Sequence, residues 1–118
     1  LSSCILLLVR LKNLKWRLRE NIMPAVTRIG DADDIHCSVP TRAEGSPDVF
    51  ANGIAVSRQG DKNTVHMKNP PQCDDSHEAA IAVGSSKVFI NGKGCGRVGD
   101  AITGCTSVAT GSPNVFSG

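Results

Sequence analysis

The chain contains two copies of one seventeen-residue unit, which match without a gap. The copies span residues 45–61 and 84–100, and each contains Gly-Ser, Val-Phe, Asn-Gly, Arg and Gly-Asp in that order. Because these elements recur together at fixed offsets, generic turn-forming composition does not account for the match. The chain is therefore expected to fold as copies of one small structural unit.

A third copy is divided between the two ends of the chain. Residues 25–31 match the second half of the unit, and residues 111–116 match its first half. A strand around Val115 is therefore predicted to pair with a strand around Val26. This pairing would close the domain into a ring with pseudo-threefold symmetry.

Each unit has the pattern of a β-hairpin. Val49-Phe50 and Val88-Phe89 are short stretches of strand-forming residues. They are followed by Asn52-Gly53 and Asn91-Gly92, and Asn-Gly is preferred in two-residue type I′ turns. Each closing Gly-Asp is expected to form a second tight turn. The sequence thus predicts an all-β domain of three hairpins, one of them formed by the paired terminal strands.

The small aromatic content of the chain limits its core. The 118 residues are enough for one domain, but they include only three Phe, one Trp and no Tyr, against twelve Gly. Domains with so little core usually need a disulfide, a metal ion or a partner for stability. Five Cys and three His supply candidates for such a staple.

The start of the chain differs from the repeats, so we divide it into an extension at 1–22 and a domain at 23–118. The apolar run Ile5–Val9 is too short to span a bilayer, and basic residues follow it rather than precede it as in a secretory signal. Leucines at helical spacing leave open a basic amphipathic helix lying on a membrane. We favour the alternative that translation begins at Met23 and that the extension is absent from the native protein.

The charge balance of the domain argues against nucleic acid as a partner. Residues 23–118 contain eight Lys and Arg against ten Asp and Glu, because the other basic residues lie in the extension. A nucleic-acid-binding domain is expected to carry a basic surface.

Residues of metal-ligand type stand at matching positions after the Gly-Asp turns. Five residues beyond the three aspartates come His36, His66 and Cys105. The predicted ring would bring these side chains together, and imidazole nitrogen with thiolate sulfur suits Zn²⁺. Tetrahedral zinc needs a fourth ligand, for which the long connection 62–83 offers Cys73 and His77.

The remaining cysteines allow a different staple. A disulfide between Cys37 and Cys73 is the alternative to a metal site, although the cysteine spacings match no disulfide framework. Cys95 lies within a hairpin where the other copies carry Val26 and Val56, so we expect it to pack in the core.

The combined pattern, Gly-Ser-Pro-x-Val-Phe-x-Asn-Gly followed by Arg-x-Gly-Asp with interspersed histidines, resembles the PAAR-repeat proteins of tailed phages and type VI secretion systems. The resemblance covers residues 24–118. It implies a cone-like β domain whose broad base docks on a trimeric β-helical spike and whose apex is stapled by zinc. In that family three histidines and one cysteine bind the metal, and the matching positions are His36, His66, His77 and Cys105.

The tetrapeptide that names the family is not kept. In each of the three copies, the four residues that stand in place of Pro-Ala-Ala-Arg match it only at the final arginine. These arginines are Arg28, Arg58 and Arg97. Larger members of the family also carry toxin domains fused to the tip. We expect no fused effector here, because Gly118 lies two residues beyond the last repeat strand.

The resemblance implies a structural function and no enzymatic activity: one copy would cap the trimeric spike and sharpen it for envelope penetration. The protein would lie at the spike tip of a virion, or be secreted at the tip of a type VI apparatus, and touch the target membrane transiently. No small-molecule substrate is expected. The expected spike-docking residues are Val49, Phe50, Val88, Phe89, Val115 and Phe116, and strand alternation lets only one of each pair face the core.

Two other functions compete with this one. A zinc hydrolase needs an open metal position for water and a general base, and four protein ligands leave no such position. Glu78 follows His77 but lacks the His-Glu-x-x-His spacing of metalloproteases. A small zinc module that serves as a protein adaptor is the second alternative, and the residues alone leave it open.

Overall fold

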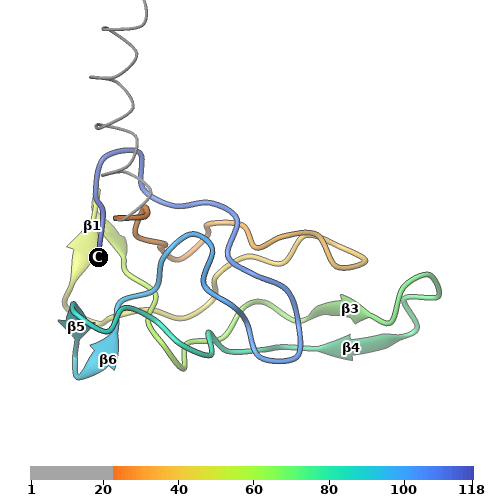
Figure 1. Cartoon of the computed structure of the whole chain (residues 1–118). Coiled ribbons are helices and arrows are strands. Elements are labelled where there is room, and N and C mark those ends of the chain that lie inside the picture. The colour runs from red at the N-terminus through yellow and green to blue at the C-terminus, as the bar shows by residue number, and fades with distance from the viewer. Residues whose placement is uncertain (1–22) are drawn as a thin grey trace, which may run out of the picture.

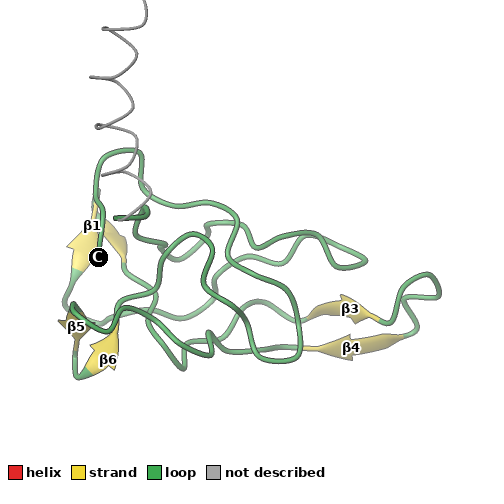
Figure 2. Cartoon of the chain, viewed as in Figure 1, coloured by secondary structure: helices red, strands yellow, loops and turns green. Residues whose placement is uncertain are grey.

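In the computed structural model, residues 23–118 are described and form a small all-β domain (Figure 1). The expectations for residues 1–22, a membrane helix or an untranslated extension, lie outside the described residues. The strands are short, and most of the described chain is turn and loop (Figure 2). Within residues 23–118 no helix is long and apolar enough to cross a membrane.

Both hairpins predicted within the complete units are confirmed. In each, two antiparallel strands are joined by an Asn-Gly turn. The φ angles are 56° and 75° for Asn52 and Gly53, and 54° and 77° for Asn91 and Gly92, as a type I′ turn requires. The strands are β1 (Phe50–Ala51), β2 (Ile54–Ala55), β5 (Phe89–Ile90) and β6 (Lys93–Gly94).

The terminal segments also pair as predicted. Ala25 and Phe116 form an antiparallel bridge, and the Val26 amide donates to the Val115 carbonyl oxygen at 2.9 Å. Matching hydrogen bonds occur in the two complete hairpins, from Val56 to Val49 at 3.1 Å and from Cys95 to Val88 at 2.9 Å. The split unit is therefore assembled from both ends of the domain.

Three buried backbone segments, one from each unit, hydrogen-bond to one another in a closed circle. The Thr27 amide donates to the Gly96 carbonyl oxygen at 3.0 Å, the Gly96 amide to Ser57 at 2.9 Å, and the Ser57 amide to Thr27 at 3.0 Å. All three residues are buried. Because each bond joins a different pair of units, loss of one unit would leave buried backbone groups of the other two unpaired.

A second circle of backbone pairing follows the Gly-Asp turns. Its three antiparallel bridges join buried residues, and the pairs are Arg42 with Asn63, Ile81 with Ile102, and Val108 with Asp33. The three segments that lead away from the turns are thus packed against one another. This packing limits where the loops beyond them can reach.

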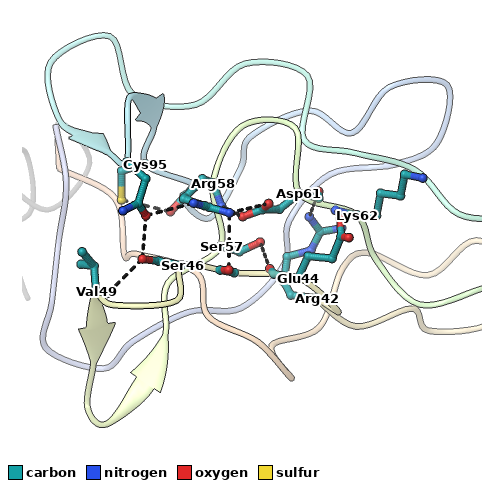
Figure 3. Close-up of polar contacts among 12 residues, drawn as sticks. Arg42, Glu44, Ser46, Val49, Ser57, Arg58, Asp61, Lys62 and Cys95 are labelled. Carbon is teal, nitrogen blue, oxygen red and sulfur yellow. Dashed lines mark hydrogen bonds and ion pairs between the residues drawn. The ribbon is translucent and has the colours of Figure 1, made fainter.

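The arginine kept in every unit is fixed by the aspartate three residues later. The backbone amide and Nε of Arg58 both donate to Oδ2 of Asp61 at 2.8 Å (Figure 3). Each such pair spans a Gly-Asp turn whose glycine has a φ of 89° to 92°. The other two pairs are Arg28 with Asp31 and Arg97 with Asp100. The conserved spacing Arg-x-Gly-Asp within the chain's three copies therefore corresponds to one repeated contact.

The apolar core consists of two small clusters. One contains Val26, Ala51, Val56, Ile90 and Cys95. The other contains Ala79, Ile81, Ile102 and Val108, with Val98 and Cys105 packed against it. Cys95 is 1% exposed, which confirms its predicted role in packing.

Neither residue of any Val-Phe pair faces the core, although strand alternation would let one of each pair do so. Their exposures run from 37% for Val49 and Val115 to 61% for Phe89. The next residues of β1 and β5, Ala51 and Ile90, are buried in the core instead. Each strand begins at its Phe, so alternation turns the Phe outward and the next residue inward, while the Val lies before the strand.

The connection 62–83, which the sequence marked as an inter-repeat loop, contains a fourth hairpin. Strands β3 (His66–Lys68) and β4 (Asp75–His77) pair antiparallel and place His66 opposite His77. In Figure 1 this hairpin lies at the far end of the domain from β1, β5 and β6. Its turn contains two prolines and no Asn-Gly, so the local hairpin signal is missing.

Substitution of Gly96 by Ala should destabilise the domain. A Cβ there would lie 2.6 Å from the Ser57 carbonyl oxygen and 2.8 Å from Cδ1 of Ile81, so the closed circle must shift. Overpacking of this kind costs about 1–3 kcal/mol. The midpoint of urea unfolding measures the change.

The matched control is Ser57→Ala, which adds no atom to the circle. It removes only the hydrogen bond from Ser57 Oγ to the Glu44 carbonyl oxygen, a loss of about 1 kcal/mol. Equal stability of the Gly96→Ala variant and the wild type would show that the circle is not tightly packed.

Candidate metal centre

Four side chains of metal-ligand type converge near the base of the β3–β4 hairpin. His36 lies in the loop after the first Gly-Asp turn, His66 begins β3, His77 ends β4, and Cys105 lies in the loop after the last turn. One possible ligand atom of each lies within 4.8 Å of the others. The structure therefore brings together the four residues to which the repeat offsets and the family resemblance pointed.

The contacts within the cluster are close. His66 Nε2 lies 3.2 Å from Cys105 Sγ. The ring centroids of His66 and His77 are 4.4 Å apart, and that of His36 is 5.1 Å from His77 and 5.5 Å from His66. The three rings are inclined to one another by 45° to 70°, so they do not stack face to face.

One ring nitrogen of each histidine, Nε2, is available to a cation. Nδ1 of His66 donates to the Thr64 carbonyl oxygen at 2.7 Å, so in the neutral tautomer Nε2 is the nitrogen that carries the lone pair. Nε2 of His36 and Nε2 of His77 are buried and have no hydrogen-bond partner within residues 23–118. Buried polar atoms are normally paired. A cation held by the cluster would supply the partner that these nitrogens lack.

Burial shifts the pKa values of two of the four groups in opposite directions. Burial, and after it the positive charge that His66 can carry, lowers the pKa of His77, which favours its neutral form. Burial also raises the pKa of the Cys105 thiol. The imidazole is therefore ready to bind a cation, whereas Cys105 must release a proton when the cation binds.

Cys37 and Cys73 form a disulfide, with their Cα atoms 5.7 Å apart. Cys73 is therefore not part of the cluster, and the position that spacing left open falls to His77. The sequence treated this disulfide and a histidine and cysteine cluster as alternatives, and this was wrong because the disulfide and the cluster occur together. The disulfide joins the residue after His36 to the turn of the hairpin that carries the other two histidines.

The donor set determines which ions the cluster can hold. It consists of three imidazoles and one thiol, and no carboxylate belongs to it among the described residues. Nitrogen and sulfur donors favour Zn²⁺ and other borderline or soft ions over Mg²⁺ and Ca²⁺. Four protein ligands around a tetrahedral ion leave no open position for water or substrate.

Comparison of the chain with models of known protein families gave no match, and neither did a search of curated proteins. The resemblance to PAAR-repeat proteins rests on the residue pattern described above. It is therefore carried forward as a proposal.

Removal of the disulfide by Cys37→Ser with Cys73→Ser should lower metal affinity about tenfold, because the His36 loop must then be ordered when the ion binds. Stability should also fall, by about 3–4 kcal/mol for a closed loop of this length, 36 residues of sequence separation. Competition with a chelator measures the affinity, and thermal unfolding measures the stability.

Cys95→Val is the control for loss of a cysteine, since it introduces the residue that the other two copies carry. It should leave metal affinity unchanged. If the double serine variant binds metal as tightly as the wild type, the loop is held in place without the disulfide.

Proposed function

We propose that this protein is the metal-stapled tip of a trimeric β-helical spike, as the PAAR-repeat proteins are in contractile injection machines. The observation that carries the proposal is the separation of two unlike ends. Hairpins β1–β2 and β5–β6, with their exposed Val-Phe pairs, lie at one end, and the histidine and cysteine cluster adjoins the β3–β4 hairpin at the other (Figure 1).

The ion in the cluster is Zn²⁺. Three imidazoles and a thiolate match its preference for nitrogen and sulfur in tetrahedral geometry. The four ligands come from three different connections, so the ion would add a cross-link between segments that share only a small apolar cluster. Metal binding then contributes directly to the free energy of folding.

The partner is a homotrimer, and one copy of this protein binds each trimer. The backbone circle through Thr27, Ser57 and Gly96 uses one residue from each of three similar units. A pseudo-threefold axis through this circle would let one chain offer three similar surfaces to a partner with true threefold symmetry. That match explains why one chain carries three versions of one hairpin.

The docking surface is formed by the Val-Phe pairs. All six side chains are exposed although they are large and apolar, which is typical of surfaces that a partner covers. The hairpins also have unpaired edges that strands of a partner could extend. The residues proposed for this surface are Val49, Phe50, Val88, Phe89, Val115 and Phe116.

Such a protein acts mechanically. Contraction of the machine would drive the spike and its cap through an envelope, so contact with the target membrane is brief. The protein would belong to a virion tail or be secreted with a type VI tip, and the genes beside its own would distinguish the two. A zinc-dependent protein adaptor is the alternative, and a zinc hydrolase is disfavoured by the closed donor set.

One Zn²⁺ per chain should remain bound after dialysis against metal-free buffer, because four protein ligands enclose it. Elemental analysis of the purified protein measures the content. His66→Ala removes the ligand with the deepest burial and should lower both zinc content and thermal stability. Wild-type protein with an intact disulfide and no metal would contradict the zinc staple.

Val88→Asp should abolish capping while zinc content stays unchanged, because it places a charge among the Val-Phe pairs. Val83→Asp is the control, since Val83 is also exposed, at 65%, but lies in the connection before the repeat. The mass of the complex with the cognate spike protein gives the ratio. Three copies per trimer, or no binding by the zinc-loaded wild type, would refute the tip assignment.

A further inference from the structure

The residue just before each Val-Phe pair differs in charge between the three units. It is Asp48 in the first unit, Lys87 in the second and Asn114 in the split unit, and all three are exposed. The position after the Asn-Gly turn differs as well, with exposed Ile54 in one hairpin and exposed Lys93 in the other. At this end of the domain, the Val-Phe pairs are therefore the exposed side chains that recur in all three units.

Hydrogen bonds between side chains join the first unit to the second. Ser46 donates its hydroxyl to Oδ1 of Asn91 at 2.7 Å, and Nη1 of Arg58 donates to the same oxygen at 2.9 Å. Nδ2 of Asn91 donates back to Oδ1 of Asp48 at 2.8 Å. The Ser46 hydroxyl also accepts from the Val49 amide at 2.9 Å, so this junction holds a Val-Phe pair in place (Figure 3).

The split unit is joined to the first unit in the same way. Ser112 donates to Oδ1 of Asn52 at 2.6 Å, and Nη1 of Arg28 donates to that oxygen at 3.1 Å. Nδ2 of Asn52 donates to Oδ1 of Asn114 at 2.7 Å. Asn114 thus does what Asp48 does at the first junction, so the junction needs an acceptor at this position rather than a charge.

The third junction, between the second unit and the split unit, has no asparagine. Ser85 donates to a main-chain oxygen of Gly118, which occupies the position that Asn52 and Asn91 have in the other hairpins. Glycine has no side-chain amide to donate, and here the residue before the Val-Phe pair is Lys87 instead of an acceptor. A Cβ on Gly118 would lie 3.9 Å from Cδ of Lys87, so the lysine side chain passes beside it. The residues before the Val-Phe pairs therefore vary with the junctions that they serve.

This variation limits what a threefold partner can gain from charge. A homotrimer presents the same side chain to each of the three units. A charged residue opposite these positions would attract one of Asp48 and Lys87, repel the other and meet no charge on Asn114. At similar distances the attraction and the repulsion cancel, whereas the partner's charge still loses its water.

We propose that the partner meets this end of the domain with an uncharged, apolar face. Its three chains would contact the three Val-Phe pairs, and the unlike residues Asp48, Lys87 and Asn114 serve the junctions of this protein instead. The inference rests on the proposed function and specifies the chemistry of the partner in it.

The test gives every unit the residue that the split unit carries, with Asp48→Asn and Lys87→Asn made singly and together. Calorimetry measures the affinity for the cognate spike protein at about 50 mM NaCl, where charges are weakly screened. Each variant should bind within about twofold of the wild type, because no charge on the partner faces these positions. Lys93→Ile, which introduces the residue of the first hairpin, should behave likewise.

Two results would overturn the inference. A charged partner face would shift the affinity about tenfold, in opposite directions for Asp48→Asn and Lys87→Asn. A change of that size with the same sign in both would show that the partner recognises the unlike residues one by one. Absence of any binding by the zinc-loaded wild type would instead refute the proposed function.

Asp48→Ala tests the junction separately and needs no partner. It removes the acceptor for Nδ2 of Asn91, whereas Asp48→Asn keeps one. The midpoint of urea unfolding should fall in the alanine variant and stay at the wild-type value in the asparagine variant. Equal midpoints in the two variants would show that Asp48 does not serve the junction, and its charge would then need another explanation.

Discussion

Three backbone hydrogen bonds, from Thr27 to Gly96, from Gly96 to Ser57 and from Ser57 to Thr27, join the three units in a closed circle. The bonds are buried and each depends on the other two units, so the units cannot order independently. The circle also accounts for the residue types. The three positions are occupied by small residues, and at Gly96 even a Cβ would collide with the Ser57 carbonyl oxygen. The rest of the domain is built outward from this constraint.

Toward the β3–β4 hairpin, few apolar side chains are available to hold the loops in place. The cluster of Ala79, Ile81, Ile102 and Val108 ends where Cys105 packs against it. Beyond that point the structure relies on the Cys37–Cys73 disulfide, on the four-residue cluster and on the buried polar contacts of Asn63. Small domains commonly replace core with such staples. Here the disulfide links two of the three segments that carry the proposed metal ligands, the His36 loop and the β3–β4 hairpin.

In the other direction, the short hairpins leave the Val-Phe pairs in water. Exposed apolar side chains lower the solubility of an isolated domain. A partner that covers the pairs would remove this disadvantage. Under the proposed function, a partner covers the apolar end, and four ligands around a bound ion at the other end would leave no position for a substrate. The three similar units give such a cap a natural match to a trimer.

The sequence by itself determined the features that depend on short, fixed spacings. The Asn-Gly hairpins, the pairing of the terminal strands, the packing of Cys95 and the positions of His36, His66 and Cys105 all follow from one repeated register. Only the tertiary structure decided the features that depend on long-range approach. The β3–β4 hairpin has no local turn signal, yet it sets His77 opposite His66 and frees Cys73 to pair with Cys37. Asn63 reaches residues 30 positions before it and 16 positions after it, and no local pattern records contacts that exist only once the chain has closed on itself.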